Sequence, residues 1–422
     1  MDRTMRITDL SISDLESRQA VLQGEYDEVK AAKLSLDLTR GKPATAQLDL
    51  SNELDGILEG FFLLQDGTDV RNYGGILGIP EARELGATIL GIDSESVMVG
   101  GNSSLTMMYN YVSHMLTRWQ EEDGTIKFIC PVPGYDRHFT ICEQLGIEMI
   151  TVGFTDDGPD MDAIDSLMAS DPMIKGIWCV PRYSNPTGHS YIDEVVKRFA
   201  KLGKSAGNHF RIIWDNAYAV HHLADTPDRL TNLLAACEKE DTSDSVVMFA
   251  STSKVTFAGS GISFVGTSAQ NLSDFEAFLS TQLIGFDKVN QLRHVRFLKD
   301  ADAIKAHMEK HKDIVQPKFA MVEQKLDSAL AGKGVASWTK PKGGYFVSLD
   351  TTYGVADEVV ELAADAGVKL TPAGATFPYG QDPDNSNIRI APTYPPIAEL
   401  DKAMDVFVLC LELATVTHLI TA

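Results

Sequence analysis

The stretch "FASTSKVTFAGSGISF" (249–264) places one lysine, Lys254, in a serine-rich turn directly after an apolar run. The apolar residues before the turn predict a buried β-strand, and those at its far end predict a second strand. In open α/β sheets, ligands bind at the carboxyl ends of the strands. Lys254 is therefore a candidate functional residue, and further functional residues are expected where the other predicted strands end.

Short apolar runs alternate with longer helical patterns through the middle of the chain, such as the helix predicted from "YIDEVVKRFAKLGKSAG" (191–207). This alternation is typical of a mostly parallel sheet with helices on both faces, which is an α/β fold. Seven apolar runs predict a single seven-stranded sheet: Val97–Gly100, Ile126–Cys130, Glu148–Val152, Gly176–Val180, Arg211–Trp214, Val246–Phe249 and Ile262–Gly266.

The two ends of the chain follow other patterns. Ser13–Lys33 has a helical period, which ends before the helix-breaking residues Gly41 and Pro43. Beyond about Lys299, a long charged helix is followed by short strands, and this order predicts a smaller α+β domain.

Composition excludes several classes of function. The 422-residue chain carries a net charge of −22, which disfavours binding to nucleic acids and to anionic membranes. The N-terminus lacks the apolar run of a signal peptide, and the apolar segment 403–420 is interrupted by acidic residues, so it predicts a packed helix. The five cysteines have no zinc-type spacing, so we expect free thiols, a cytoplasmic protein and no metal site.

Polar or aromatic side chains follow five of the predicted strands. A Gly-Asn-Ser-Ser turn (101–104) before a helix can bind an anion through its backbone N–H groups, although such turns often only cap helices. The other strand ends supply Tyr135, Asn185 and Asp215, the last with Tyr218 close behind. Each of these residues alone could be structural, since Asn-Pro makes turns and aromatic residues pack in cores.

Their convergence at one edge of the sheet is more informative than any single residue. A phosphorylated pyridine aldehyde would use all of them. Lys254 would form the Schiff base, Asp215 would hold the pyridine nitrogen protonated, and the Gly-Asn-Ser-Ser turn would bind the phosphate. The sequence therefore predicts pyridoxal 5′-phosphate as the cofactor.

The order of motifs resembles that of class I pyridoxal-phosphate-dependent aminotransferases of fold type I. The opening "LTRGKPATAQLDLS" (38–51) and the stretch 253–264 are similar to an atypical bacterial aspartate aminotransferase branch, subgroup Ic. The resemblance covers most of the chain through "YGGILGIPEAREL" (73–85), "GGNSSLT" (100–106), "PGYDRHF" (133–139), "SNPTG" (184–188), "DNAY" (215–218), "STSK" (251–254) and "NIRIAPTYP" (387–395).

The resemblance implies a role for each matching residue. Lys254, Asp215 and Tyr218 would be catalytic, with Lys254 moving the proton after forming the Schiff base. His138 would support Asp215, and burial would lower the pKa of Lys254. The cofactor would also contact Gly101, Asn102, Ser103, Tyr135, Asn185, Ser251, Ser253 and the partner subunit's Tyr73, and the substrate would contact Arg389, Gly41, Asn185 and Arg40.

The chain departs from the family at one position. Most relatives have a phosphate-binding arginine eight residues after the lysine, where this chain has Ile262. Either the turn and its serines hold the phosphate alone, or a basic residue from elsewhere, such as Arg40 or Lys42, replaces it. The cation for a distal substrate carboxylate is also open, with Lys288, Arg293 and Arg296 as candidates.

The resemblance implies a homodimer with shared active sites and three chain segments. Residues 1–65 would contribute to the small domain, 66–300 would form the large cofactor-binding domain, and 301–422 would form the rest of the small domain. The expected reaction moves the amino group of aspartate or glutamate to a 2-oxo acid such as 2-oxoglutarate, in two half-reactions. Alternatives are another amino donor, a β-decarboxylase or lyase on the same fold, and a ligand-binding regulatory module.

Overall fold

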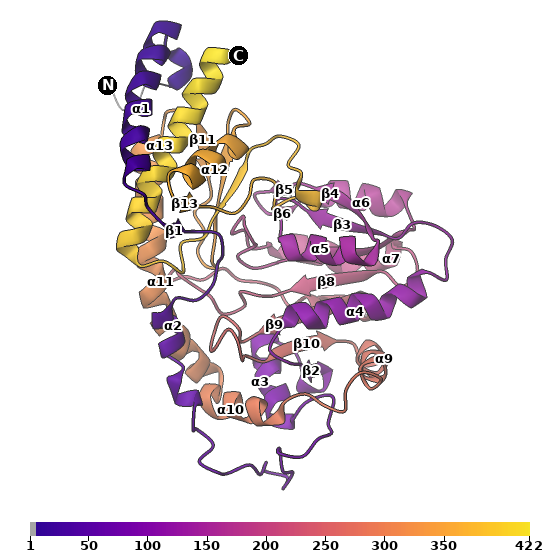
Figure 1. Cartoon of the computed structure of the whole chain (residues 1–422). Helices are drawn as coiled ribbons and strands as arrows, with labels where there is room; N and C mark the ends of the chain where they lie inside the picture. Colours follow the sequence, from indigo (N-terminus) through magenta and orange to yellow (C-terminus); the bar gives the residue numbers. More distant parts are fainter. Residues whose placement is uncertain (1–5) are drawn as a thin grey trace.

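The computed structural model describes residues 6–422, which form a larger part and a smaller part (Figure 1). The larger part is built on a seven-stranded sheet with the order β2-β10-β9-β8-β7-β3-β4. Its strands are β2 (Val97–Val99), β3 (Lys127–Pro131), β4 (Glu148–Val152), β7 (Ile174–Cys179), β8 (Arg211–Asp215), β9 (Val246–Ser251) and β10 (Ser263–Thr267).

The seven predicted runs are the seven strands of this sheet, so the fold-class prediction is confirmed. Strand β10 is antiparallel to both of its neighbours, whereas the other adjacent pairs are parallel. Strands β3, β7, β8 and β9 have no exposed residue, because helices cover both faces of the sheet and a buried strand needs apolar side chains on each. The carboxyl ends of β3, β7, β8 and β9 therefore lie along one edge.

Each face of the sheet has its own apolar core. One face packs against α3 (Pro80–Leu90), α6 (Met161–Ser170), α7 (Asp193–Ser205) and α8 (Leu233–Lys239). The other face packs against α4 (Ser104–Trp119), α5 (Asp136–Leu145) and α9 (Ala269–Leu279). A short hairpin, β5 (Phe154–Thr155) with β6 (Gly158–Pro159), follows β4.

The smaller part combines residues from both ends of the chain. It contains the antiparallel sheet β11 (Ala336–Trp338), β12 (Val347–Thr351) and β14 (Asn387–Ile390), and β1 (Leu36–Asp37) pairs with β13 (Val368–Lys369). Its helices are α1 (Ile12–Ala31), α12 (Ala356–Asp365) and α13 (Ile397–Thr421), and α1 and α13 lie side by side at the top of Figure 1. The remaining helices are α2 (Thr45–Asp49), α10 (Lys288–Leu298) and α11 (Ala301–Leu330).

Helix α11 belongs to both cores, because its first turns pack with the large sheet and its later turns pack with α13. The division at 1–65, 66–300 and 301–422 stays a prediction, although the early residues Leu15 and Leu22 do pack in the smaller core. By length and composition alone α13 could cross a bilayer, yet 61% of its most apolar 18-residue segment is buried inside the structure. This agrees with the packed helix predicted there, and all five cysteines are buried and free.

Candidate active site

Several of the predicted site residues line a cavity of about 110 Å³ between the sheet edge and the smaller part. Its wall is made by the ends of β8 and β9, the starts of α4 and α5, and two residues of the smaller part. The lining residues are Gly41, Ser104, Leu105, Met108, Tyr135, Val180, Asn185, Asp215, Ala217, Tyr218, Lys254 and Phe346. Six of these, Gly41, Tyr135, Asn185, Asp215, Tyr218 and Lys254, were predicted from sequence.

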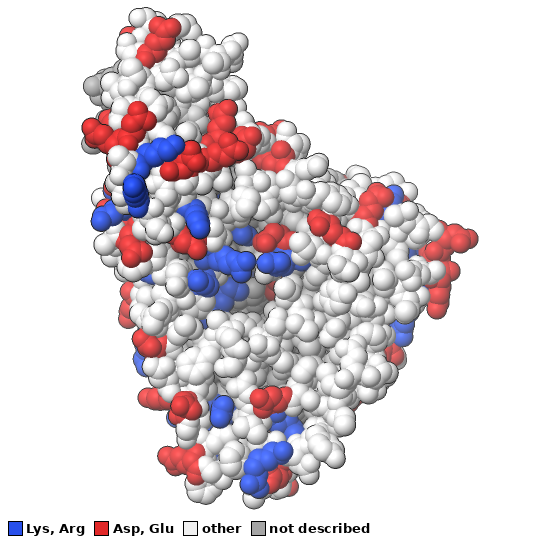
Figure 2. All heavy atoms as spheres, in the orientation of Figure 1, with Lys and Arg blue, Asp and Glu red and all other residues white. Residues whose placement is uncertain are grey.

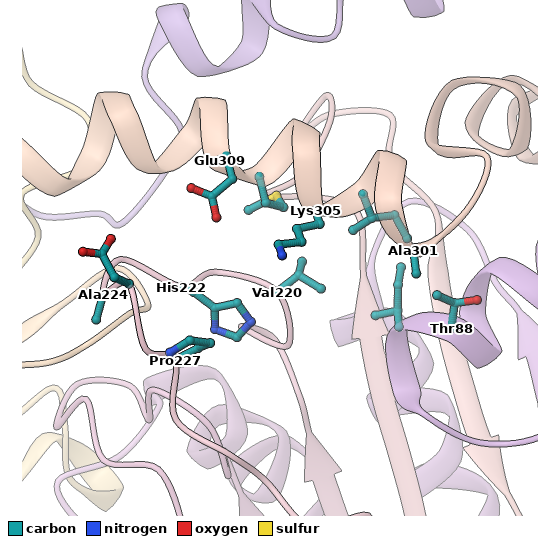
Figure 3. A pocket seen from close by; sticks show the side chains of 12 residues that line it. Thr88, Val220, His222, Ala224, Pro227, Ala301, Lys305 and Glu309 are labelled. Carbon is teal, nitrogen blue, oxygen red and sulfur yellow. The ribbon is translucent and has the colours of Figure 1, made fainter.

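A larger cavity of about 340 Å³ lies elsewhere, between α3, α11 and the loop after β8 (Figure 3). His222, Lys305 and Glu309 line it, and it contains none of the predicted site residues. The smaller cavity is the candidate active site, because a reaction depends on which chemical groups lie together rather than on the volume of a cavity.

Lys254 lies at the bottom of the cavity, in the turn after β9. Its Nζ is 5.0 Å from the ring centre of Tyr218. Burial lowers the pKa of the Lys254 amine, and the negative charge of Asp215 partly opposes that shift. A lowered pKa raises the fraction of uncharged amine near neutral pH, which is what a nucleophile or a general base requires.

Asp215 ends β8 and is 2% exposed. Its Oδ2 is 3.1 Å from Nε2 of His138, and the ring of His138 stacks on Trp178 with a centroid separation of 4.2 Å. The other oxygen, Oδ1, is buried and has no hydrogen-bond partner within residues 6–422. A buried carboxylate oxygen without a partner is costly, so this atom is suited to accept a hydrogen bond from an N–H group of a bound molecule.

The backbone of Lys254 is held from the opposite side by residues that the sequence did not reveal. Its carbonyl oxygen is 3.2 Å from Nε2 of His221 and accepts a 3.4 Å hydrogen bond from the Tyr345 hydroxyl. Gln47, in α2, donates to the Tyr345 hydroxyl and lies 3.1 Å from Nδ1 of His311. Gln47 lies within the quoted stretch 38–51, but no motif predicts these contacts, because they arise only when α2 and α11 pack behind the turn.

These buried histidines predict a pH-dependent stability. Burial lowers the pKa of His221 to about 3 and that of His311 to about 4. The unfolded chain therefore takes up more protons than the folded one below pH 6.5, and the stability present above that pH is lost as the pH falls. We expect these two histidines alone to lower the free energy of unfolding by about 2 to 3 kcal/mol between pH 6 and pH 5.

Urea unfolding of the parent protein and of His311→Gln at the two pH values isolates one of these contributions, and the variant should lose about 1 kcal/mol less than the parent between pH 6 and pH 5. Equal unfolding free energies at pH 6 and pH 5 would contradict the assignment of neutral, buried imidazoles.

The predicted phosphate-binding turn is organised around the start of α4. Ser103 caps the helix by accepting a hydrogen bond from the N–H of Thr106. Ser104, which belongs to the predicted turn but was not named individually as a site residue, lines the cavity instead. Asn102 donates to the carbonyl of Gly259, and the Ser253 hydroxyl donates to the carbonyl of Asn102. The two predicted segments thus lie against each other.

The other predicted turn residues complete this region. The carbonyl of Gly101 accepts a 2.8 Å hydrogen bond from Ser263, and the Ser251 hydroxyl oxygen accepts a bond from the N–H of Ser253. Ile262 is 1% exposed and packs in the apolar core, so its side chain takes no part in anion binding.

The predicted cations have different environments. Arg296 donates to the carbonyls of Leu58 and Phe61, Lys288 is 8% exposed, and Arg293 lines a separate cavity with Ser260. Arg40 is exposed, whereas Lys42 lies 3.8 Å from the ring centre of Tyr394. None of these five basic residues lines the cavity around Lys254.

Arg389, on β14, approaches the cavity from the smaller part. Its Nη1 donates to Oδ1 of Asn185 at 3.2 Å and to Oδ1 of Asp136 at 3.1 Å. Asp136 was not among the predicted residues, although it lies inside the motif "PGYDRHF". Tyr73 is 80% exposed and is not part of the cavity lining of its own chain.

The arrangement fits pyridoxal 5′-phosphate. The buried amine of Lys254 could react with the aldehyde of the cofactor. The unpartnered oxygen of Asp215 could accept a hydrogen bond from the pyridinium N–H, and the ring of Tyr135 could stack on the ring of the cofactor. The helix start beside them offers backbone N–H groups to a phosphate.

Comparisons with known proteins agree with this geometry. The sequence model of the family described as "Aspartate amino-transferase" matches residues 10–422. An aspartate aminotransferase from Corynebacterium glutamicum is 44% identical over 99% of this chain and 99% of its own. The crystal structure of an aspartate transaminase from that species superposes with a TM-score of 0.95 at 44% identity, covering 98% of this chain and 99% of the other.

A more distant structure shares the fold. The α-aminoadipate aminotransferase LysN from Thermus thermophilus, complexed with N-(5′-phosphopyridoxyl)-L-leucine, superposes with a TM-score of 0.74 at 19% identity, covering 98% of this chain and 100% of its own. With a family match over nearly its whole length and a lysine–aspartate pair buried at the sheet edge, this chain belongs to the aspartate aminotransferase family, whose fold-type-I enzymes transfer amino groups with pyridoxal 5′-phosphate.

Proposed function

We propose that this chain transfers the amino group of aspartate or glutamate to a 2-oxo acid such as 2-oxoglutarate. The observation that carries the proposal is that Lys254 and Asp215 line one cavity, while Arg389 donates a hydrogen bond to Asn185, which lines the same cavity. The 44% identity to an aspartate aminotransferase supports dicarboxylate substrates. Figure 2 shows basic side chains grouped around a hollow on this face, which would attract anionic substrates despite the acidic net charge of −22.

Each residue would have a separate task. When bound, pyridoxal 5′-phosphate supplies an aldehyde for the amino group and a ring that accepts electrons. Asp215 would keep a proton on the ring nitrogen, and His138 would orient Asp215 by holding its second oxygen. Lys254 would carry a proton between the substrate Cα and the aldehyde carbon of the bound cofactor, using the uncharged amine that burial favours.

The remaining residues would position the reactants. Tyr135 would stack on the ring, and Asn185 and Tyr218 would hydrogen-bond to the ring oxygen. Gly101, Asn102, Ser103, Ser251 and Ser253 would surround the phosphate at the start of α4, and Ser104 is added because it lines the cavity. Arg389 would clamp the substrate α-carboxylate, and the cation for a distal carboxylate remains among Arg40, Lys288, Arg293 and Arg296.

The test of the proposed function is product analysis with aspartate and 2-oxoglutarate. We expect oxaloacetate and glutamate in equal amounts, with parallel lines in double-reciprocal plots because the two half-reactions are separate. Alanine would indicate β-decarboxylation, and pyruvate with ammonia would indicate elimination. If the protein converts another amino donor but not aspartate, aspartate is not its substrate, although the protein is still an aminotransferase.

Gly41 offers a prediction about the substrate side of the cavity. A Cβ at this position would lie 2.5 Å from Cζ of Phe346, whose ring centre is 4.9 Å from the Arg389 guanidinium carbon. Gly41→Ala should displace the ring and then Arg389, lowering kcat/KM for aspartate by about ten- to a hundredfold.

Steady-state kinetics of Gly41→Ala measure this loss. Gly24→Ala is the matched control, because a Cβ at Gly24 meets no atom within 4 Å and should leave kcat/KM unchanged. Full activity in Gly41→Ala would mean that the Phe346 ring moves without affecting Arg389.

We also propose that the protein is a cytoplasmic homodimer in which Tyr73 completes the partner's site. Tyr73 and Ile284 are 80% and 64% exposed, and their loops touch, since a Cβ at Gly285 would lie 2.7 Å from the carbonyl oxygen of Gly74. Large apolar side chains exposed together are typical of an interface.

Sedimentation should therefore give a dimer that Ile284→Asp weakens by at least about tenfold in dissociation constant. Ile12→Asp is the control, because Ile12 is similarly exposed, at 56%, but lies on α1. A fully active monomer would contradict the proposal.

A further inference from the structure

Arg389 already pairs with a carboxylate of its own chain. Its Nη1 donates to Oδ1 of Asp136 at 3.1 Å and to Oδ1 of Asn185 at 3.2 Å, and the side chain is 7% exposed. The guanidinium carbon lies 4.9 Å from the ring centre of Phe346, which limits its movement. One of the three guanidinium nitrogens, Nη1, thus donates to two acceptors.

The opposite edge of the same guanidinium has no acceptor. Nε of Arg389 is buried and lacks a hydrogen-bond partner within residues 6–422. Nε and Nη2 together form an edge that matches a carboxylate through two parallel hydrogen bonds. A buried donor without a partner is costly, so this edge is suited to receive the carboxylate of a bound acid.

Asp136 comes from the other side of the active site. It is the first residue of α5, whereas Arg389 lies on β14 in the three-stranded sheet of the smaller part. The positive end of the α5 dipole favours a negative charge at this position. Its side chain is 31% exposed, and its other oxygen, Oδ2, also forms a longer ion pair with Arg137, whose Nε is 3.8 Å away.

We propose that Asp136 sets the affinity of Arg389 for substrate carboxylates. This inference rests on the proposed role of Arg389 as the α-carboxylate clamp. Asp136 holds Nη1 and so presents the Nε–Nη2 edge to the cavity, while its negative charge repels the second carboxylate that binds there. Asp136 is thus a positioning residue whose charge keeps substrate and product exchangeable.

The two effects can be separated by one substitution. Asp136→Asn keeps an oxygen acceptor for Nη1 and removes the negative charge. The carboxylates of Asp136 and of a bound acid would lie within a few ångström of each other on the Arg389 guanidinium. Removal of the Asp136 charge should therefore tighten binding of the acid by about tenfold. Asp165→Asn is the matched control, since Asp165 also pairs with an arginine, Arg198, at an exposed site on α6.

The test is titration calorimetry of the pyridoxal-phosphate-loaded protein with maleate, an unreactive dicarboxylate, and with 3-phenylpropionate, which has one carboxylate. We expect Asp136→Asn to bind both about tenfold more tightly, and Asp165→Asn to bind them like the parent protein. In steady-state assays KM for aspartate and for 2-oxoglutarate should fall together, while kcat does not rise because product leaves more slowly.

The outcomes distinguish this inference from the proposed function. If the parent protein transaminates aspartate but Asp136→Asn binds the acids equally or more weakly, Asp136 only positions Arg389 and the inference is wrong. If the parent protein neither binds the acids nor transaminates aspartate, the proposed clamp itself fails, and the inference fails with it.

Discussion

Replacement of Lys254 with alanine is expected to lower kcat for transamination by at least about 10⁴-fold, because a single amine serves as nucleophile and as general base. The amine is buried beside Tyr218 and Asp215, and within residues 6–422 it is the lysine that lines this cavity. Water cannot replace it, since a proton carrier must sit within hydrogen-bond reach of the reacting carbon.

Steady-state kinetics of the cofactor-saturated variant would measure this loss, together with borohydride labelling, which should no longer attach the cofactor to the chain. Lys305→Ala is the matched control, because Lys305 lines the larger cavity of Figure 3 and should be dispensable. Less than a tenfold loss in Lys254→Ala, or a large loss in Lys305→Ala, would move the active site to the other cavity.

Asp215→Asn is expected to lower kcat by about 10²- to 10³-fold, the loss that corresponds to removing one partner of a buried charge pair. Asparagine has nearly the same shape and keeps an acceptor for His138, so the loss would come from the missing charge. The positive ring nitrogen would lose its counter-charge, and the pKa of Lys254 would fall further because the charge of Asp215 opposes its lowering.

Two measurements on Asp215→Asn are needed: steady-state kinetics for kcat, and a titration of the apoenzyme with pyridoxal 5′-phosphate for cofactor affinity. We expect both kcat and cofactor affinity to fall. Thermal unfolding of the apoenzyme checks that the fold is retained. A variant with normal kcat and weakened cofactor binding would show that Asp215 serves only to hold the cofactor.

The amino-acid sequence by itself determined the α/β class and the seven strands, because a strand buried on both faces needs a short apolar run that a reader can locate. It also determined that Lys254, Asp215, Asn185 and Tyr135 would meet, since each follows a strand whose end lies on the same edge. The supporting role of His138 came from the family spacing, and its contact with Asp215 agrees with that.

Only the tertiary structure decided which groups approach from the rest of the chain. The pairing of Arg389 with Asp136, the packing of Phe346 against Gly41 and the contact of Tyr345 with the Lys254 carbonyl join residues far apart in sequence. Such contacts depend on how two separately packed cores are set against each other, and apolar periodicity reports only which face of each element is buried. The strand ends could therefore be predicted from the sequence, whereas the groups that face them across the cavity could not.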